Sequence, residues 1–331
     1  MASEAASSER GLDFLVIGAQ RAGTTALYEY LRGHPELYLP PGKELPFFSH
    51  DRVYRQGWER YTRFFSRAPP DSLVGTVTTQ YMAGALMDRV EPPPADEDLA
   101  TEIPRRIVAA FPRVRLIAVL RDPVERAVSQ HRLAVMRGWE RRTFGEAIST
   151  LSTEPQLSEA RRRPGETNSY IVFGEYDRIL AGYLRHFPRE QLCVISSHDL
   201  ATHPELTLGK VFEFLEVDSS FHPRNAHRRY NQSEDRRRMG WLNPWRWQLS
   251  LSGNRIARGV WHRLPSGVRH AIDEPYREAA WRVFLWNRAS GGTSRRTAPD
   301  DVVRRLEAHF GPGMARLSDL IGPVSGLRST D

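Results

Sequence analysis

The sequence predicts an α/β fold in which helices cover both faces of a central, mainly parallel β-sheet. Three features of the sequence support this prediction. Short apolar runs rich in β-branched residues recur along the chain, segments with helical periodicity lie between them, and a glycine-bounded loop joins the first run to the first such segment. Strands that alternate with helices form βαβ units, whose parallel strands are buried on both faces.

The elements are predicted in chain order from their patterns. Four apolar runs are expected to form strands, at residues 14–17, 73–77, 114–120 and 191–196. Apolar residues that recur every three or four positions predict helices, at residues 25–32, 102–111, 124–138, 176–187 and 300–310. An aspartate is expected to cap the last of these helices. Loops are expected where prolines and carboxylates or irregular polar residues gather, at residues 84–101 and 152–168.

Composition restricts the class of protein. A chain of 331 residues with 40% hydrophobic residues can bury a substantial core. Its one cysteine, Cys193, excludes an intramolecular disulfide and fits a reducing compartment. No apolar segment typical of a signal peptide stands at the N-terminus, and no apolar run reaches membrane-spanning length, so a cytoplasmic protein is expected. Only two of the 47 basic residues are lysines, a bias typical of a GC-rich, bacterial genome.

The net charge of +7 favours anionic ligands such as nucleotides, nucleic acid, sulfated or phosphorylated glycans and membrane surfaces. Six arginines within residues 224–238 fit nucleic-acid binding and equally a solvated face. Residues 241–264 mix tryptophan with arginine, which fits an interfacial membrane helix, a lid over a cleft or ordinary core. The eleven histidines show no spacing typical of metal ligands, so no metal site is expected.

The loop after the first predicted strand has the features of an anion site. Residues 14–31 read FLVIGAQRAGTTALYEYL, and Gly18 and Gly23 have the G-x-x-x-x-G spacing of a phosphate-binding P-loop. The N–H groups and dipole of a helix N-terminus attract anions. A nucleotide-hydrolysing loop would have Lys where Thr24 stands, and the cation here is Arg21. Phosphate binding without a metal is therefore favoured over NTP hydrolysis, and a plain strand–helix turn is the alternative.

A second anion site is expected after the third predicted strand, in RLIAVLRDPVERAVSQH. Arg121 follows the strand directly, at the carboxyl end where open α/β sheets bind ligands. Ser129 lies about two helical turns further on, so the two residues can hold a phosphate together. Arg126 is expected to assist, or to pair with Glu125 or Glu29 on the surface. Two anion sites on neighbouring strands predict a ligand that is phosphorylated at two ends.

With both motifs in place, the sequence resembles the sulfotransferase family that uses 3′-phosphoadenosine 5′-phosphosulfate (PAPS), closest to the heparan-sulfate type and its bacterial relatives. The matching stretches include FLVIGAQRAGTTALYEYLRGHP, KELPFFS, RLIAVLRDPVERAVSQHRLAVMRG and FGEYDRILAGYLRHFPREQLCVISSHDL. The resemblance implies a P-loop-like three-layer fold in a single domain. It divides that domain into a core with the cofactor site over 12–225, a variable acceptor or lid region over 226–299 and a C-terminal helix over 300–322.

The resemblance also implies a role for each matched position. The loop would bind the 5′-phosphosulfate through seven residues: Gly18, Gln20, Arg21, Ala22, Gly23, Thr24 and Thr25. Arg121 and Ser129 would bind the 3′-phosphate, and Arg295 and Arg296 would close over the nucleotide. Arg21 would also act in catalysis by neutralising the bridging oxygen, at a position where the family usually has Lys.

On the acceptor side, Glu44 falls where O-sulfating members of the heparan type place their general base, which takes the proton of a sugar hydroxyl. A solvated loop carboxylate is the alternative. Four further residues are expected to line the acceptor: Lys43, His50, Thr78 and Tyr81. Several relatives place a Glu-Lys pair where this sequence has Thr76 and Val77, so a heparan-type acceptor does not follow from the resemblance.

The leading hypothesis is metal-free, in-line transfer of the sulfuryl group of PAPS to a hydroxyl of a carbohydrate, glycolipid or secondary metabolite, with adenosine 3′,5′-diphosphate as product. The acceptor is expected to be a small molecule or a glycan, with peripheral membrane contact through 241–264 as a further hypothesis. A P-loop phosphotransferase and a basic nucleic-acid-binding protein are the alternatives, although nucleic acid is not expected as a partner. The sequence predicts neither the particular acceptor nor the oligomeric state.

Overall fold

The computed structural model describes residues 11–90, 99–223, 236–237, 288–289 and 298–327. The chain divides into two compact units. One comprises Met1–Leu39, Glu44–Tyr230 and Arg296–Asp331, and the other comprises Pro40–Lys43 and Asn231–Arg295. In the second unit, two short strands pair antiparallel, β6 (Arg236–Arg237) and β7 (Arg288–Ala289). The expected organisation as a single domain stays a prediction.

The first unit contains a five-stranded sheet in the order β2-β3-β1-β4-β5. All neighbouring strands in it are parallel, which confirms the predicted fold class. The strands are β1 (Phe14–Gly18), β2 (Leu37–Tyr38), β3 (Leu73–Val77), β4 (Arg115–Leu120) and β5 (Leu192–Ser196). Four of them are the predicted apolar runs, and β2 is too short to stand out in the sequence. The strand β1 is entirely apolar because it lies in the middle of the sheet, where every one of its residues is buried.

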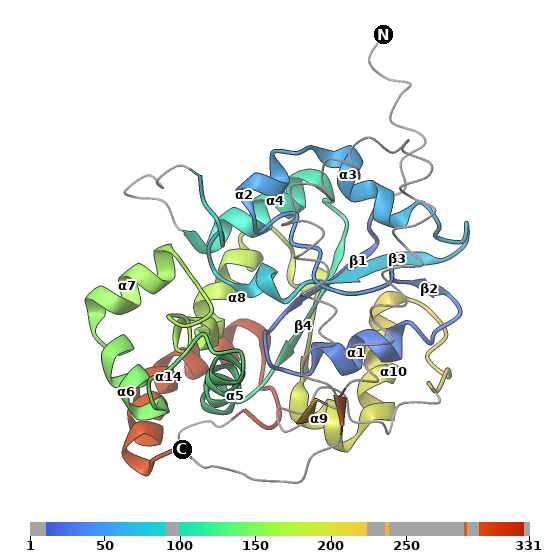
Figure 1. The fold of residues 1–331 in the computed structure, drawn as a ribbon. Coiled ribbons are helices and arrows are strands. Elements are labelled where there is room, and N and C mark those ends of the chain that lie inside the picture. The colour runs from blue at the N-terminus through green and yellow to red at the C-terminus, as the bar shows by residue number, and fades with distance from the viewer. Residues whose placement is uncertain (1–10, 91–98, 224–235, 238–287, 290–297, 328–331) are drawn as a thin grey trace. The chain divides into compact units, whose positions relative to one another are not determined.

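Helices connect the parallel strands. After β1 comes α1 (Thr24–Leu31), α4 (Glu102–Ala110) precedes β4, and α5 (Pro123–Met136) and α8 (Tyr176–Leu184) lie between β4 and β5. Figure 1 shows α1 and α10 (Pro204–Leu215) on one side of the sheet and α4 and α8 on the other. The sheet extends from β1 in both directions, toward β3 and β2 and toward β4 and β5, with helices on each face (Figure 1).

Four helices were predicted close to their observed places, and shorter ones join them. The shorter helices are α2 (Asp51–Tyr54), α3 (Trp58–Thr62), α6 (Phe144–Leu151) and α9 (Ser197–Thr202). The loop predicted over 84–101 lies partly outside the described residues and ends in a 3₁₀ turn at Leu99–Thr101.

Two segments differ from the prediction. Residues 152–168 were expected to be a loop, yet they contain α7 (Glu154–Arg162). This helix buries only Leu157 and Ala160, so it lacks a clear apolar stripe, while Thr153 at its N-cap and the proline in its first turn mark its start. The last helix, α14 (Asp300–Ile321), matches the C-terminal helix over 300–322 that the resemblance implied, although periodicity alone predicted an end at residue 310. It contains Pro312, and its N-cap is Pro299 rather than an aspartate.

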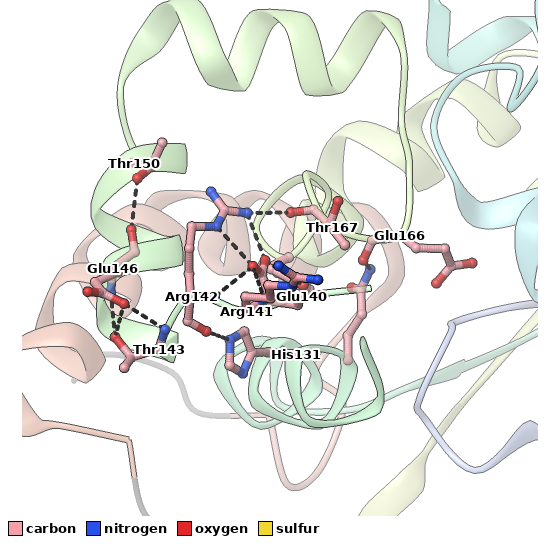
Figure 2. Close-up of polar contacts among 11 residues, drawn as sticks. His131, Glu140, Arg141, Arg142, Thr143, Glu146, Thr150, Glu166 and Thr167 are labelled. Carbon is pink, nitrogen blue, oxygen red and sulfur yellow. Dashed lines mark hydrogen bonds and ion pairs between the residues drawn. The ribbon is translucent and has the colours of Figure 1, made fainter. Parts of the chain in front are cut away.

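A buried carboxylate fixes the chain after α5. Glu140 is 6% exposed and accepts hydrogen bonds from the backbone of Arg141 and Arg142, from the Arg142 guanidinium and, over 3.1 Å, from the Tyr170 hydroxyl. Arg142 Nη2 also donates to the Thr167 carbonyl over 3.2 Å, as Figure 2 shows. These bonds attach the segment 163–170, which borders the site described below, to the end of α5.

The hydrogen bonds of Arg142, together with the two backbone N–H groups, lower the pKa of the Glu140 carboxyl from 4.5 to about 2. A carboxyl whose pKa is lower in the folded state stabilises the fold above pH about 4.5, and this contribution is lost as the pH falls toward 2. Glu140→Gln is therefore expected to lower the free energy of unfolding at pH 7 by about 2–3 kcal/mol. The difference from the wild type should shrink below pH about 4.5.

Urea unfolding at pH 7 and pH 3 would measure both effects. Glu190→Gln, at an exposed glutamate, is the matched control and should leave the free energy of unfolding unchanged at both pH values. An equal loss of stability for Glu140→Gln at the two pH values would contradict the assigned role of the charge.

Candidate active site

The loop between β1 and α1 has the geometry of an anion site. Gly23, the N-cap of α1, has φ 99°, a left-handed conformation that favours glycine. Gly23 has no side chain with which to cap α1, and the N-terminal, positive end of the helix dipole faces the loop. Gly18, the other glycine of the loop, has no room for a side chain, because a Cβ atom there would lie 2.8 Å from the Met82 side chain. The side chains of Thr24 and Thr25 are buried at the start of the helix.

The two anion sites predicted from the sequence meet in one hydrogen-bonded group. Arg21 Nε donates to Ser129 Oγ over 3.0 Å, and Arg121 Nη1 donates to the Arg21 carbonyl over 3.4 Å. Arg121 also pairs with Glu125, four residues further along α5, over 2.9 Å. The Arg21 side chain thus lies beside Ser129, the residue that the resemblance assigns to the phosphate at the other end of the nucleotide.

Arg126 differs from its prediction. The sequence suggested a residue that assists with phosphate or pairs with Glu125 or Glu29 on the surface. Instead, its side chain is fully buried, and it donates to Gln130 Oε1 over 2.7 Å and to the Tyr170 carbonyl. Burial lowers the pKa of the Arg126 guanidinium to about 10, so the group stays protonated near neutral pH. Its polar contacts inside the core replace the expected surface pair.

Glu44 is held against the carboxyl end of β3. Its backbone N–H donates to the Val77 carbonyl over 2.8 Å. Its carboxylate accepts from the Thr79 N–H over 2.9 Å and from the Thr79 hydroxyl over 3.1 Å. Because Thr78 N donates to the Val16 carbonyl, this end of β3 lies next to the end of β1. Glu44 and the loop after β1 therefore occupy the same edge of the sheet.

The other residues expected on the acceptor side have mainly structural contacts. Thr78 and Tyr81 are buried, and their hydroxyls bond to the main chain of Leu45 over 3.2 and 2.6 Å. His50 hydrogen-bonds with the Ser49 hydroxyl over 3.1 Å, and burial lowers the pKa of its imidazole. Lys43 is half-buried and belongs to the second unit. Their roles toward an acceptor stay predictions.

One contact at the loop was missed by the sequence reasoning. Gln20 Nε2 lies 3.3 and 3.5 Å from the two carboxylate oxygens of Glu166. Glu166 stands in the polar segment that was expected to be a loop, and 146 residues separate the pair. No local pattern marks such a partner, because only the packing of the segment 163–170 beside the loop creates it.

Some expectations fall outside the described residues. Arg295, Arg296, most of the arginines in 224–238 and the whole of 241–264 are among them. Within the described part of the chain, no group of three or more His, Cys, Asp or Glu residues could hold a metal ion. No described helix is long and apolar enough to cross a membrane.

Comparison with known proteins assigns the family. A model of the Sulfotransferase family matches residues 13–223, which include the loop after β1, Glu44 and the Arg121–Ser129 segment. The chain belongs to this family. The fold agrees, because the crystal structure of a sulfotransferase from Alicyclobacillus acidocaldarius superposes with a TM-score of 0.61. That comparison covers 94% of this chain and 96% of that one, at 20% sequence identity.

Curated relatives are similar over the same core. Human heparan sulfate glucosamine 3-O-sulfotransferase 3B1 is 31% identical over 201 residues, which cover 61% of this chain and 45% of that protein. The human bifunctional heparan sulfate N-deacetylase/N-sulfotransferase 2 is 29% identical over 218 residues, covering 62% of this chain and 22% of that protein. The chain thus spans less than half the length of these relatives.

Proposed function

We propose that this protein transfers the sulfuryl group of PAPS to a hydroxyl of a carbohydrate acceptor. The observation that carries this proposal is the hydrogen-bonded group at the carboxyl ends of β1 and β4, where Arg21 reaches Ser129 and Arg121 reaches the backbone of Arg21. Two guanidinium groups and several hydroxyls at a helix N-terminus match a ligand with phosphate at both ends. Membership of the family supports PAPS as that ligand.

The residues fit the nucleotide by the chemistry of their donors. The glycines at positions 18 and 23 allow the backbone to approach a phosphosulfate group, and the α1 N-terminus adds dipole and N–H donors. Arg121 and Ser129 supply a guanidinium fork and a hydroxyl for the 3′-phosphate. PAPS, when bound, supplies an activated sulfuryl group, and the chain's residues orient it and stabilise charge.

In the proposed reaction, the acceptor oxygen forms a bond to sulfur while the bond from sulfur to the 5′-phosphate oxygen breaks. Glu44 takes the proton of the acceptor hydroxyl, and adenosine 3′,5′-diphosphate leaves. The bonds from the Thr79 N–H and hydroxyl orient the Glu44 carboxylate, whose oxygens are the atoms that would accept the proton. Arg21 stabilises the negative charge that develops on the leaving oxygen.

The names of the relatives and the residues near Glu44 bear on the identity of the acceptor. Both curated relatives carry names that specify heparan sulfate, and the first also names glucosamine; this supports a glycan. A glycolipid or a hydroxyl-bearing secondary metabolite fits the same chemistry. Val77 stands where several relatives have Lys, and its side chain is fully buried, so recognition of a polyanion would rely on other cations. Metal independence and a cytoplasmic location stay predictions.

A P-loop phosphotransferase is less well supported as a function. Thr24 occupies the position of the Lys that contacts the β- and γ-phosphates in such enzymes. A nucleic-acid-binding function would rest on arginines that mostly lie outside the described residues, and it leaves the paired anion sites unexplained.

Adenosine 3′,5′-diphosphate is expected to bind the purified protein, and EDTA should not change its affinity. Arg121→Ala should weaken binding at least about tenfold, because a charge-assisted hydrogen bond to the 3′-phosphate is lost. Isothermal titration calorimetry measures both effects, and Arg113→Ala, at an exposed arginine, is the matched control. Absence of binding, or binding of ATP only with Mg²⁺, would contradict the proposal.

Glu44→Gln is expected to lower kcat about 100-fold or more, because the amide cannot take a proton in the transition state. Affinity for adenosine 3′,5′-diphosphate should stay within about twofold of wild type, since the bonds of Glu44 are to Thr79 and Val77. Transfer from labelled PAPS to a panel of hydroxyl acceptors, including glucosamine oligosaccharides, gives the rate. Glu59→Gln, at an exposed glutamate, serves as control, and full activity of Glu44→Gln would exclude Glu44 as the base.

Glu125→Gln is expected to raise the affinity for adenosine 3′,5′-diphosphate about twofold to fivefold, since Arg121 no longer has to leave a carboxylate partner. The gain should shrink in high salt, because the Glu125 side chain is 55% exposed and its charge is screened. Calorimetry at low and high salt checks this. Equal or weaker binding by the variant would show that Arg121 does not exchange Glu125 for the phosphate.

A further inference from the structure

In the loop after β1, the two polar atoms of the Gln20 side-chain amide have different surroundings. The amide nitrogen of Gln20 faces the Glu166 carboxylate, at 3.3 and 3.5 Å from its two oxygens. The amide oxygen, Oε1, is buried and has no hydrogen-bond partner in the described part of the chain. A buried acceptor without a partner is costly, which points to a ligand group that supplies the missing donor.

The Glu166 carboxylate determines which polar atom of the Gln20 amide is without a hydrogen-bond partner. If the amide were rotated by half a turn, Oε1 would face the carboxylate at the same 3.3–3.5 Å, and two acceptors would repel each other. The N–H end must therefore face Glu166. The buried position consequently receives an acceptor atom and not a donor.

Two sets of hydrogen bonds hold the backbone at Glu166 in place. Its carbonyl accepts from Gln130 Nε2 over 3.1 Å, and Gln130 Oε1 in turn accepts from the buried Arg126. The neighbouring Thr167 carbonyl accepts from Arg142, which is bound to Glu140. Figure 2 shows the Glu166 side chain pointing away from the Glu140–Arg142 cluster. The side chain that meets Gln20 is thus carried by a fixed backbone.

We propose that Glu166 is a positioning residue of the donor loop, which turns Gln20 Oε1 toward a hydroxyl group of the bound substrates. The inference rests on the proposed function. The sulfate and 5′-phosphate oxygens of PAPS carry no proton near neutral pH, and the 3′-phosphate is mostly fully ionised, so these oxygens are poor donors to Oε1. A hydroxyl can donate, and it belongs either to the acceptor or to the ribose of the nucleotide. Glu166 acts through Gln20 and does not touch the reacting atoms.

A double-substitution cycle tests the coupling of the two residues. Glu166→Ala and Gln20→Ala should each lower kcat/KM about tenfold, and the double variant should be no worse than the Gln20→Ala variant. Glu166→Gln should stay within about twofold of wild type, since its amide oxygen still accepts from Gln20. Glu159→Gln, at an exposed glutamate on α7, is the control for loss of a charge.

Two arms of the experiment identify the source of the hydroxyl. If the ribose provides it, Gln20→Ala weakens the binding of adenosine 3′,5′-diphosphate in calorimetry. If the acceptor provides it, this affinity is unchanged and the KM for a glucosamine oligosaccharide rises.

Independent effects of the two single substitutions, or a Glu166→Gln variant as poor as Glu166→Ala, would overturn the proposal. The proposal would also be overturned if Gln20→Ala changed neither the affinity for adenosine 3′,5′-diphosphate nor the KM for the oligosaccharide. Failure of the wild type to bind the nucleotide would instead overturn the proposed function itself, together with this inference. Thermal unfolding of each variant separates loss of fold from loss of positioning.

Discussion

The site depends on one constraint, the position of β1 between β3 and β4 in a parallel sheet. Parallel strands end at the same edge, so the loop after β1 lies between the residues that follow its two neighbours. The order of strands thus brings Arg21 to Arg121 and Ser129 on one side, and places the Glu44–Thr79 pair on the other. An anion site and a candidate base meet because the sheet extends from β1 in both directions.

The fold was largely predictable because its signals are local. Each of the four main strands is a largely apolar run whose residues are mostly buried, and α1, α4, α5 and α8 show the apolar spacing of helices. The prediction was wrong where local signals are weak, as in α7, which buries two side chains and is otherwise polar. Arg126 shows a related limit, because an arginine is normally exposed and its burial depends on a tertiary contact to the Tyr170 carbonyl besides the local contact to Gln130 one turn along α5.

The chemistry of the candidate site could be predicted from residue types, but its pairings could not. A glycine loop with an arginine, followed a hundred residues later by another arginine and a serine, indicated a ligand with two phosphates. The contacts that orient these groups join residues far apart in the chain, as Arg21 with Ser129, Glu44 with Thr79 and Gln20 with Glu166. Such pairs have no periodicity or spacing of their own, since the fold alone decides which segments meet.

Two of these residues also share an unusual backbone. Arg21 and Glu44 have φ values of 69° and 68°, in the left-handed region that costs an ordinary side chain about 1–2 kcal/mol. Hydrogen bonds to the neighbouring strands offset this cost, from Arg121 to the Arg21 carbonyl and from Glu44 N–H to the Val77 carbonyl. Strain of this kind persists where surrounding contacts hold the backbone, and it is concentrated at functional sites. Since the sheet edge fixes both backbones before any ligand arrives, the loops that carry Arg21 and Glu44 need little backbone rearrangement during the proposed transfer, and such preorganisation favours electrostatic catalysis.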